Sequence, residues 1–409
     1  MLSAVALLLM ILLASFPRAS ISYNAVKDCS LLVRSARLPN GARGRLSRGI
    51  SSSSALHAEA KRIMFLGTPS FAASSLRKLY ESSHGSEYRV VAVVSQPPRP
   101  KGRKMKLTPS PVQVEAERIN KAIGEAGGEE VAVMTPESAK DEDFLGQMES
   151  LGVDLCVTAA YGCYLPKKFL SMPPLGTVNI HPSLLPRWRG ASPVQRSLEA
   201  GDAEIGVSLL YTVSKMDAGP IVSQIVVEDD REKQATQVLE ELFDLGTDDL
   251  VRFLPKIISG EVTFGGARAQ HEAEVSHAKM ISKDEGYLDI GSLGARQLHN
   301  KVRGLEMWPG THFFVEYAGE KGAKKKVKVG KTRVVEEGIE GGGEGDQERD
   351  VQLLRLKQGK GGGLLVNCGD GSVLEVLQIQ PEAKKMMDAK SFVNGLSGAE
   401  VRWVDASSS

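Results

Sequence analysis

Short runs of apolar and β-branched residues recur along the first half of the chain, and most are followed by a stretch with helical spacing. The runs cover residues 62–66, 88–95 and 153–160, with a shorter one at 131–134. Strands with such continuous apolar sequence are typical of parallel sheets that helices cover on both faces. After the first run, Phe71, Leu76 and Leu79 can share one helical face. The pattern predicts an α/β fold built on a doubly wound, mostly parallel sheet.

The rest of the chain predicts the remaining strands and helices of this Rossmann-like domain, followed by a second, smaller domain. A strand at 177–181, a helix at 193–200, strands at 207–212 and 221–227 and a helix at 237–258 complete the first unit. Residues 298–305 are then helical, and short strands follow at 312–317, 325–333, 351–357, 364–368 and 373–379. Such strands indicate a small, OB-like β-barrel. We therefore expect a catalytic domain at 61–262, a linker at 263–276 and a C-terminal barrel at 277–403, with an acidic, disordered loop at 336–350.

The first sixty residues have the composition of a targeting presequence. An apolar run at 4–14 is about half as long as the roughly 20 residues that cross a bilayer. An Arg- and Ser-rich segment follows, in which Asp28 is the only acidic residue between Phe16 and Ala58. A signal-like core followed by a transit-like segment resembles the bipartite presequences of algae whose plastids lie behind extra membranes. We expect residues 1–60 to direct the protein to a plastid, with a mitochondrion as the first alternative and a secreted or membrane-tethered enzyme as the second.

Charge and cysteine usage restrict the possible partners. The net charge is only +1, so any contact with nucleic acid must depend on local clusters. One such cluster places five positive charges within eight residues of a Pro- and Gly-containing segment that we expect to form neither strand nor helix: Arg99, Lys101, Arg103, Lys104 and Lys106. A second lies in the barrel at Lys324, Lys325, Lys326 and Lys328. Either could instead be a solvated surface. The four cysteines, Cys29, Cys156, Cys163 and Cys368, have no zinc-ligand spacing, so we expect reduced, mostly buried thiols and no metal.

The candidate catalytic residues follow from strand geometry. Asn179 and His181 are two apart on a predicted strand, so their side chains share one face. His181 ends that strand at the carboxyl edge, where doubly wound sheets bind ligands. Asp217, in a Gly-containing turn, could orient His181. An amide and an imidazole can stabilise a tetrahedral oxyanion and relay protons, which suits acyl transfer to an amine. The chain lacks a Gly-x-Ser-x-Gly elbow, and this mechanism needs no covalent intermediate.

Several segments resemble a known family. NIHPSLLPRWRGASPVQRSLEAGDAEIGVSL and the later MDAGP are similar to the signature of the 10-formyltetrahydrofolate-dependent formyltransferases. FLGTPSFAASSL, SQPPRPKGRKMKLTPSPVQ, AYGCYLPK and LQIQPEAKKMMDAKSF also match in order, so the resemblance runs from about residue 61 to 403. It is strongest to the members that act on initiator methionyl-tRNA.

The resemblance implies roles for particular residues. Asn179, His181 and Asp217 would be catalytic, and the donor 10-formyltetrahydrofolate would be contacted by Ser183, Leu184, Leu185 and Pro186. The first basic cluster would bind tRNA. One departure is Pro182, which stands where the family usually has glycine and which lacks a backbone N–H. That substitution puts one folate contact in question.

Two other functions fit parts of the sequence. A formyltransferase for a small amine, such as glycinamide ribonucleotide or an amino sugar, needs neither the basic cluster nor the barrel. An RNA-binding protein that has lost catalysis needs none of Asn179, His181 and Asp217. We therefore expect a monomeric enzyme, without stable membrane association, that formylates the methionine of initiator methionyl-tRNA for translation in an organelle.

Overall fold

The computed structural model describes residues 59–102, 104–318, 323–335, 354–356, 362–396 and 399–406. The chain divides into compact units at 1–56 and 57–409, and the described residues belong to the second. Residues 1–58, which include most of the predicted presequence and Cys29, lie outside the described residues, as do Arg103 and the predicted acidic loop at 336–350. Within the described part of the chain, no helix is both long and apolar enough to span a membrane.

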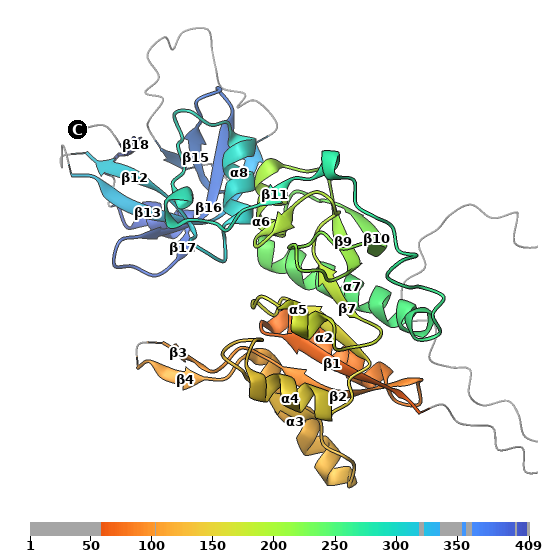
Figure 1. Ribbon diagram of the computed structural model, residues 1–409. Coiled ribbons are helices and arrows are strands. Elements are labelled where there is room, and N and C mark those ends of the chain that lie inside the picture. Colours follow the sequence, from red (N-terminus) through yellow and green to blue (C-terminus); the bar gives the residue numbers. More distant parts are fainter. Residues whose placement is uncertain are drawn as a thin grey trace, which may run out of the picture. The chain divides into compact units, whose positions relative to one another are not determined.

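A seven-stranded sheet forms the centre of the first half (Figure 1), in the order β10-β9-β7-β6-β1-β2-β5. Neighbouring strands pair in parallel throughout the run from β7 to β5, whereas β9 is antiparallel to β7 and β10 is antiparallel to β9. The predicted doubly wound, mostly parallel sheet is thus confirmed. The strands are β1 (Lys61–Gly67), β2 (Tyr88–Val94), β5 (Ala132–Met134), β6 (Leu155–Ala159), β7 (Thr177–His181), β9 (Glu204–Tyr211) and β10 (Ile221–Glu228).

Helices cover both faces of this sheet, which explains the continuous apolar runs. Ile63 and Phe65 of β1 belong to the same hydrophobic cluster as α2 (Ser70–Ser82), α3 (Pro111–Ala126) and α7 (Ala235–Ile258). Met64 and Leu66, which alternate with them, belong to the cluster of α4 (Glu142–Ser150) and α5 (Lys167–Leu170). Because successive side chains of a strand point to opposite faces, every position of β1 beyond its first residues is needed for burial. Helix α6 (Pro193–Ala200) has the bounds expected from the sequence.

The first basic segment is a hairpin, so our prediction that it forms no strand is wrong. Strands β3 (Arg99–Lys101) and β4 (Lys106–Thr108) pair with each other alone and protrude from the large sheet (Figure 1). In a two-stranded ribbon each strand is an edge strand, and Pro100 is tolerated there because proline is excluded only from central positions. The turn uses left-handed backbone at Gly102, with φ 73°, and at Met105, with φ 47°.

The second half forms an antiparallel sheet in the order β14-β15-β16-β13-β12-β18, with β17 beside β16. A backbone hydrogen bond from the Leu354 N–H to the Val401 carbonyl, at 2.9 Å, joins the two ends of this order. The sheet forms a half-barrel around a core that includes Phe313, Val327 and Trp403, in agreement with the expected small β-barrel domain. Its elements are α8 (Ala295–Gly304), β12 (Thr311–Tyr317), β13 (Lys325–Val335), β14 (Arg355–Leu356), β15 (Leu364–Asn367), β16 (Val373–Pro381), β17 (Met387–Asp388), α9 (Ala389–Asn394) and β18 (Val401–Val404).

Helix α8 is fixed to the end of β10 by a buried ion pair. The Arg303 guanidinium donates two hydrogen bonds to the Asp229 carboxylate, at 2.6 and 3.0 Å, and a third to the Lys233 carbonyl at 2.8 Å. Both charged side chains are almost fully buried. The paired geometry leaves neither charge unsatisfied in the interior.

Candidate active site

Strand β7 presents Asn179 and His181 on one face, as predicted. Val178 and Ile180 alternate with them and belong to the core that contains α7. His181 is 4 % exposed, whereas Asn179 is half-buried. Both side chains lie toward the carboxyl end of the parallel strands, where doubly wound sheets form their ligand crevice.

The structure also brings Asp217 to His181. The His181 Nδ1 lies 3.7 Å from Asp217 Oδ1, and its Nε2 lies 3.1 Å from the Trp188 carbonyl oxygen. A carbonyl oxygen only accepts, so Nε2 donates to it, and an ionised carboxylate also only accepts. At 3.7 Å the contact between Nδ1 and Oδ1 is too long for a hydrogen bond, so Asp217 acts on the ring as a nearby negative charge. This arrangement suits a group that gives up and regains a proton during a reaction.

Two hydrogen bonds hold Asp217, one to its carboxylate and one to its backbone carbonyl. Its Oδ2 accepts a hydrogen bond from the Gly190 N–H at 2.9 Å, and Gln270 Nε2 donates to the carbonyls of Asp217 and Gly219, both at 2.8 Å. Asp217 has φ 50°, a left-handed conformation that Asp tolerates better than most residues. At Gly219 an added Cβ would lie 1.7 Å from the Tyr211 carbonyl oxygen, so the turn requires glycine. The carboxylate is thus placed by backbone geometry and not only by its contact with His181.

A segment that follows α7 completes the wall of the site. Strand β11 (His277–Ala278) pairs in parallel with β8 (Arg189–Gly190), and Ser276 Oγ accepts from the Trp188 N–H at 2.9 Å. Gly190 has φ 131°, and an added Cβ would lie 2.5 Å from the Ala278 carbonyl oxygen. Part of the predicted linker at 263–276 therefore contacts the site. The domain boundaries themselves stay a prediction.

Ser208 of β9 holds the backbone of the predicted folate-binding loop in place. Ser208 Oγ donates to the Ser183 carbonyl at 2.6 Å and accepts from the Leu185 N–H at 3.1 Å and from Gln224 Nε2 at 2.9 Å. Ser183 and Leu185 are buried, whereas Leu184 and Pro186 are half-buried. The Leu185–Pro186 peptide bond is cis. Contact of these four residues with folate stays a prediction.

Pro182 fits the turn that it occupies. The Ser183 N–H donates to the His181 carbonyl at 2.8 Å, so Pro182 is the central residue of a three-residue turn. The φ of about −65° that the proline ring imposes is close to the value at the centre of an inverse γ-turn. The backbone therefore accommodates proline where the resemblance suggested glycine.

The predicted tRNA-binding residues lie on the β3–β4 hairpin and not beside β7. Arg99, Lys101, Lys104 and Lys106 are all exposed, and Arg103 lies outside the described residues. Arg99 forms an exposed ion pair with Glu137 at 3.6 Å. The register places Lys101 directly opposite Lys106. The hairpin is thus a protruding, positively charged element that is separate from the candidate catalytic residues.

Sequence reasoning missed several residues around the site. Gln270, Ser276 and the backbone groups of Trp188 and Gly190 give no local signal, because they act across long sequence separations or through the main chain. Thr158 could have been noticed, since it is the only hydroxyl within the apolar run of β6. Its Oγ1 lies 2.7 Å from Asn179 Oδ1.

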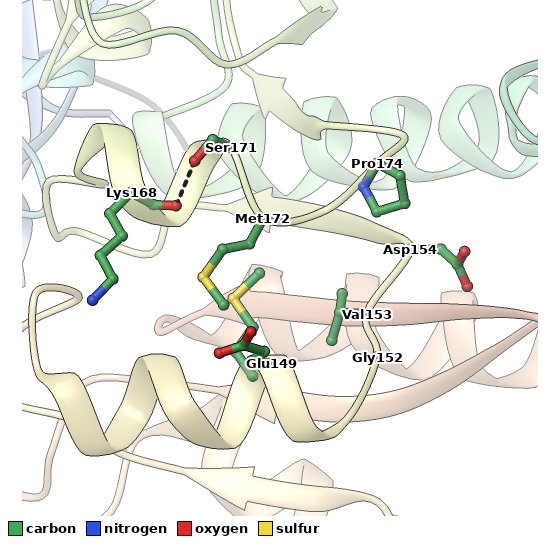
Figure 2. Close-up of a pocket in the computed structure, with 9 residues that line it drawn as sticks. Glu149, Gly152, Val153, Asp154, Lys168, Ser171, Met172 and Pro174 are labelled. Atoms are coloured by element: carbon green, nitrogen blue, oxygen red, sulfur yellow. Dashed lines mark hydrogen bonds between the residues drawn. The ribbon is translucent and has the colours of Figure 1, made fainter.

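A separate hollow of about 450 Å³ lies near the residues that precede β6, away from the carboxyl ends of the strands (Figure 2). Its lining includes Asp154, which immediately precedes β6 and accepts hydrogen bonds from Lys61 Nζ at 3.0 Å and from the Arg62 N–H at 2.8 Å. His181 lies at the other end of the neighbouring strand, so this hollow is not the catalytic crevice.

The cysteines within the described residues are free thiols. Cys156 and Cys368 are buried and Cys163 is half-buried, which confirms the expectation for these three. Burial raises the pKa of the Cys368 thiol to about 11. In the part of the chain that the structure describes, no group of three or more His, Cys, Asp or Glu residues is arranged to hold a metal ion.

Comparison with known proteins defines the class of this fold and site. The family described as formyl transferase matches residues 61–254, and the one described as formyl transferase, C-terminal domain, matches residues 280–397. The chain therefore belongs to the formyl transferase family, and it is a formyltransferase.

Individual relatives are similar over most of the chain. A protein of Desulfotalea psychrophila named methionyl-tRNA formyltransferase is 36 % identical over 351 residues, which cover 85 % of this chain and 98 % of that protein. A protein of Macrococcus caseolyticus with the same name is 34 % identical over 334 residues, covering 82 % and 95 % respectively. The structure of an N-formyltransferase from Helicobacter canadensis, in complex with folinic acid and dTDP-3-aminofucose, has a TM-score of 0.51. It shares 13 % identity and covers 79 % of this chain and 99 % of that one, so this likeness concerns the fold alone.

Proposed function

We propose that this formyltransferase moves the formyl group of 10-formyltetrahydrofolate to the α-amino group of methionine on initiator methionyl-tRNA. The observation that carries the proposal is the meeting of Asn179, His181 and Asp217 at the carboxyl end of β7. The similarity to proteins named methionyl-tRNA formyltransferase supports the choice of acceptor.

The proposed reaction needs one nucleophilic attack and one proton relay. An α-amino group has a pKa of about 8, so a fraction is already unprotonated near neutral pH. Its nitrogen attacks the formyl carbon, and the formyl oxygen becomes an oxyanion to which Asn179 can donate a hydrogen bond. His181 can also donate to it once the Nε2 proton turns from the Trp188 carbonyl, 3.1 Å away, to the oxyanion. The bond between the formyl carbon and N10 of the folate then breaks. The proton lost by the amine ends on N10, with His181 as the relay and Asp217 holding the ring in place.

The donor is proposed to bind beside the loop of Ser183, Leu184, Leu185 and Pro186. Ser208 holds this loop through hydrogen bonds to the Ser183 carbonyl and the Leu185 N–H. A loop whose backbone is already fixed can position a bound molecule without further loss of conformational entropy.

The β3–β4 hairpin supports a nucleic-acid acceptor. Like charges that face each other across a ribbon destabilise it, and Lys101 faces Lys106. Among the described residues no carboxylate forms an ion pair with Lys101, Lys104 or Lys106. Phosphates of a bound tRNA would supply the missing negative charge.

A second cationic surface lies on the outside of the barrel. Tyr287, His312 and Phe314 are half-exposed, with ring centroids 5.8 to 6.2 Å apart. On the neighbouring strand, Lys328 is directly opposite His312 and Lys326 is directly opposite Phe314. Aromatic rings flanked by exposed lysines are typical of surfaces that bind unpaired nucleotides. We propose that this aromatic-lysine surface also contacts the tRNA.

The rest of the barrel's lysine cluster has other contacts. Lys324 Nζ donates to the carbonyls of Asp405 and Ala406, at 2.9 and 3.2 Å, and Lys325 Nζ lies 4.8 Å from the centroid of the Tyr317 ring. Of the four lysines singled out in the sequence, Lys326 and Lys328 are therefore the ones that we assign to tRNA binding.

The acceptor is tested by a formylation assay on purified residues 61–409 with 10-formyltetrahydrofolate. We expect formylation of methionine-charged initiator tRNA, and no comparable turnover of glycinamide ribonucleotide or of a dTDP-linked amino sugar. Turnover of a small amine without turnover of the charged tRNA would contradict the proposal and favour the small-substrate alternative.

The catalytic assignment is tested by Asn179→Ala, His181→Ala and Asp217→Asn. Asn179→Ala and His181→Ala should each lower kcat by roughly 100- to 1,000-fold, because removal of one oxyanion-stabilising group typically costs that much. Asp217→Asn should also lower kcat strongly, because it removes the charge that holds the His181 ring in place. The folate dissociation constant should change little. Asp143→Asn, at an exposed position on α4, is the matched control. Retention of more than about a tenth of wild-type kcat by Asn179→Ala or His181→Ala would contradict the assignment.

We further propose that residues 1–60 deliver a monomeric enzyme to a plastid for translation initiation there. The support is compositional, since these residues combine an apolar run with an acid-poor, Arg- and Ser-rich segment.

A further inference from the structure

Thr158 lies next to the proposed oxyanion donor in the parallel sheet. The register of β6 and β7 pairs Thr158 with Asn179, and both side chains lie on the face opposite Val157, Val178 and Ile180. Thr158 is 5 % exposed. Its Oγ1 lies 2.7 Å from Asn179 Oδ1 and 3.4 Å from the Val178 carbonyl oxygen.

The short distance identifies the donor in this pair. A separation of about 2.7 Å is usual for O–H···O hydrogen bonds, whereas N–H···O bonds are most often about 2.9 to 3.0 Å. The contact therefore fits the Thr158 hydroxyl donating to the amide oxygen of Asn179, and it fits the flipped amide less well. The alternative acceptor, the Val178 carbonyl, is 0.7 Å farther away, as 3.4 Å compares with 2.7 Å.

This hydrogen bond determines which way the Asn179 amide faces. With Oδ1 turned toward Thr158, Nδ2 carries both of its protons away from β6. Among the described residues none accepts a hydrogen bond from Asn179 Nδ2. This atom is also not one of the side-chain atoms that are buried without a hydrogen-bond partner. A donor in that state is available to a substrate oxygen.

We propose that Thr158 is a positioning residue, which keeps the Asn179 amide turned so that Nδ2 donates to the oxyanion of the reacting formyl group. The inference depends on the proposed role of Asn179. Without the hydroxyl, the amide can rotate and present Oδ1 to the oxyanion, which is repulsive. A donor held in advance stabilises the transition state without reorganisation at the moment of reaction.

The test is Thr158→Val, which removes the hydroxyl and keeps the shape of the side chain. We expect kcat to fall roughly 10-fold, less than on removal of Asn179 itself, with the KM values for 10-formyltetrahydrofolate and charged tRNA nearly unchanged. Thr158→Ser, which restores the hydroxyl, should recover most of kcat. The matched control is Thr212→Val, because the Thr212 hydroxyl is buried without a hydrogen-bond partner among the described residues.

A double variant separates positioning from a general structural effect. In an Asn179→Ala background, Thr158→Val should cause no further loss of kcat, because the group through which it acts is gone. A full additional loss in that background would overturn the inference, as would wild-type kcat in the single Thr158→Val variant. Wild-type kcat in Asn179→Ala alone would instead overturn the proposed function of Asn179, whatever Thr158 does.

Discussion

His312 is the residue whose titration reports most directly on the charge of the aromatic-lysine surface. Burial, together with the positive charges of Lys326, Lys328 and Lys301, lowers its pKa to about 4. Because the folded-state pKa lies below the unfolded value of about 6.5, folding favours the neutral ring. The resulting stability is complete above about pH 6.5 and is lost as the pH falls toward 4.

We expect the double variant Lys326→Gln/Lys328→Gln to raise the pKa of His312. The same variant should weaken the loss of stability between pH 6.5 and 4, because less repulsion opposes protonation of the ring. Histidine titration by NMR and denaturant unfolding across this pH range measure the two effects. Binding of tRNA should also raise the pKa of His312, since phosphates add negative charge. An unchanged pKa in both experiments would argue against the surface proposed here.

For individual residues, the alternation of side chains along a strand explains why part of the site could be predicted from the sequence. Asn179 and His181 are two residues apart on a strand, which fixes their shared face. The contact between Thr158 and Asn179 depends on the register of two strands that are separated by a crossover. Sequence alone does not specify that register. Gln270 reaches Asp217 across 53 residues, and nothing in its local sequence marks it.

Among the elements, the β3–β4 hairpin offers the sharpest test of tRNA as the acceptor. Lys101→Gln/Lys106→Gln should raise the KM for charged tRNA and should reduce the slope of log affinity against log salt by roughly 0.7 to 0.9 for each lost phosphate contact. Thermal stability should not fall, because the substitutions remove a repulsive cross-strand pair. The KM for the formyl donor should stay the same.

Steady-state kinetics over a series of salt concentrations measure these effects. Lys121→Gln/Lys140→Gln, at two exposed positions, controls for the loss of two positive charges alone. Identical salt slopes for the double variant and the wild type would remove the hairpin from the tRNA-binding surface.

The hairpin also shows where element prediction from sequence fails. A proline flanked by charged residues gives the signal of an irregular loop, and we predicted one. The backbone pairing here is short and has no neighbouring strand, so neither Pro100 nor the facing lysines prevents it. By contrast, α6 and α7 follow strong periodic signals and start within two residues of their predicted positions.

For the whole molecule, the α/β domain and the barrel domain were both predictable, but the contacts that join their distant segments were not. Apolar runs predicted the parallel sheet, and a series of short strands predicted the barrel. The hydrogen bond between Leu354 and Val401 and the ion pair between Asp229 and Arg303 join residues that are far apart in sequence. Contacts of that kind depend on the packed structure and carry no local pattern.

Delivery to a plastid is the prediction that concerns the complete chain. A fluorescent protein fused to residues 1–60 should enter the plastid of an alga whose plastid lies behind extra membranes. Deletion of residues 4–14 should stop entry, because the apolar run is the signal-like part. Microscopy of both fusions is the measurement. Accumulation of the complete presequence fusion in mitochondria alone would refute the plastid proposal and leave the enzymatic one intact.

The pairing of β8 with β11 has a consequence for the order in which the enzyme is made. Asn179, His181 and Asp217 are synthesised well before Gln270, Ser276 and Ala278, which hold the backbone around them. A nascent or truncated chain that ends with α7 at Ile258 would contain every proposed catalytic side chain and lack the wall that orients them. Premature release of such a fragment would therefore yield a sheet with an incomplete site. Formyl transfer would begin only after the segment from Gln270 to Ala278 has been synthesised and has packed against the site.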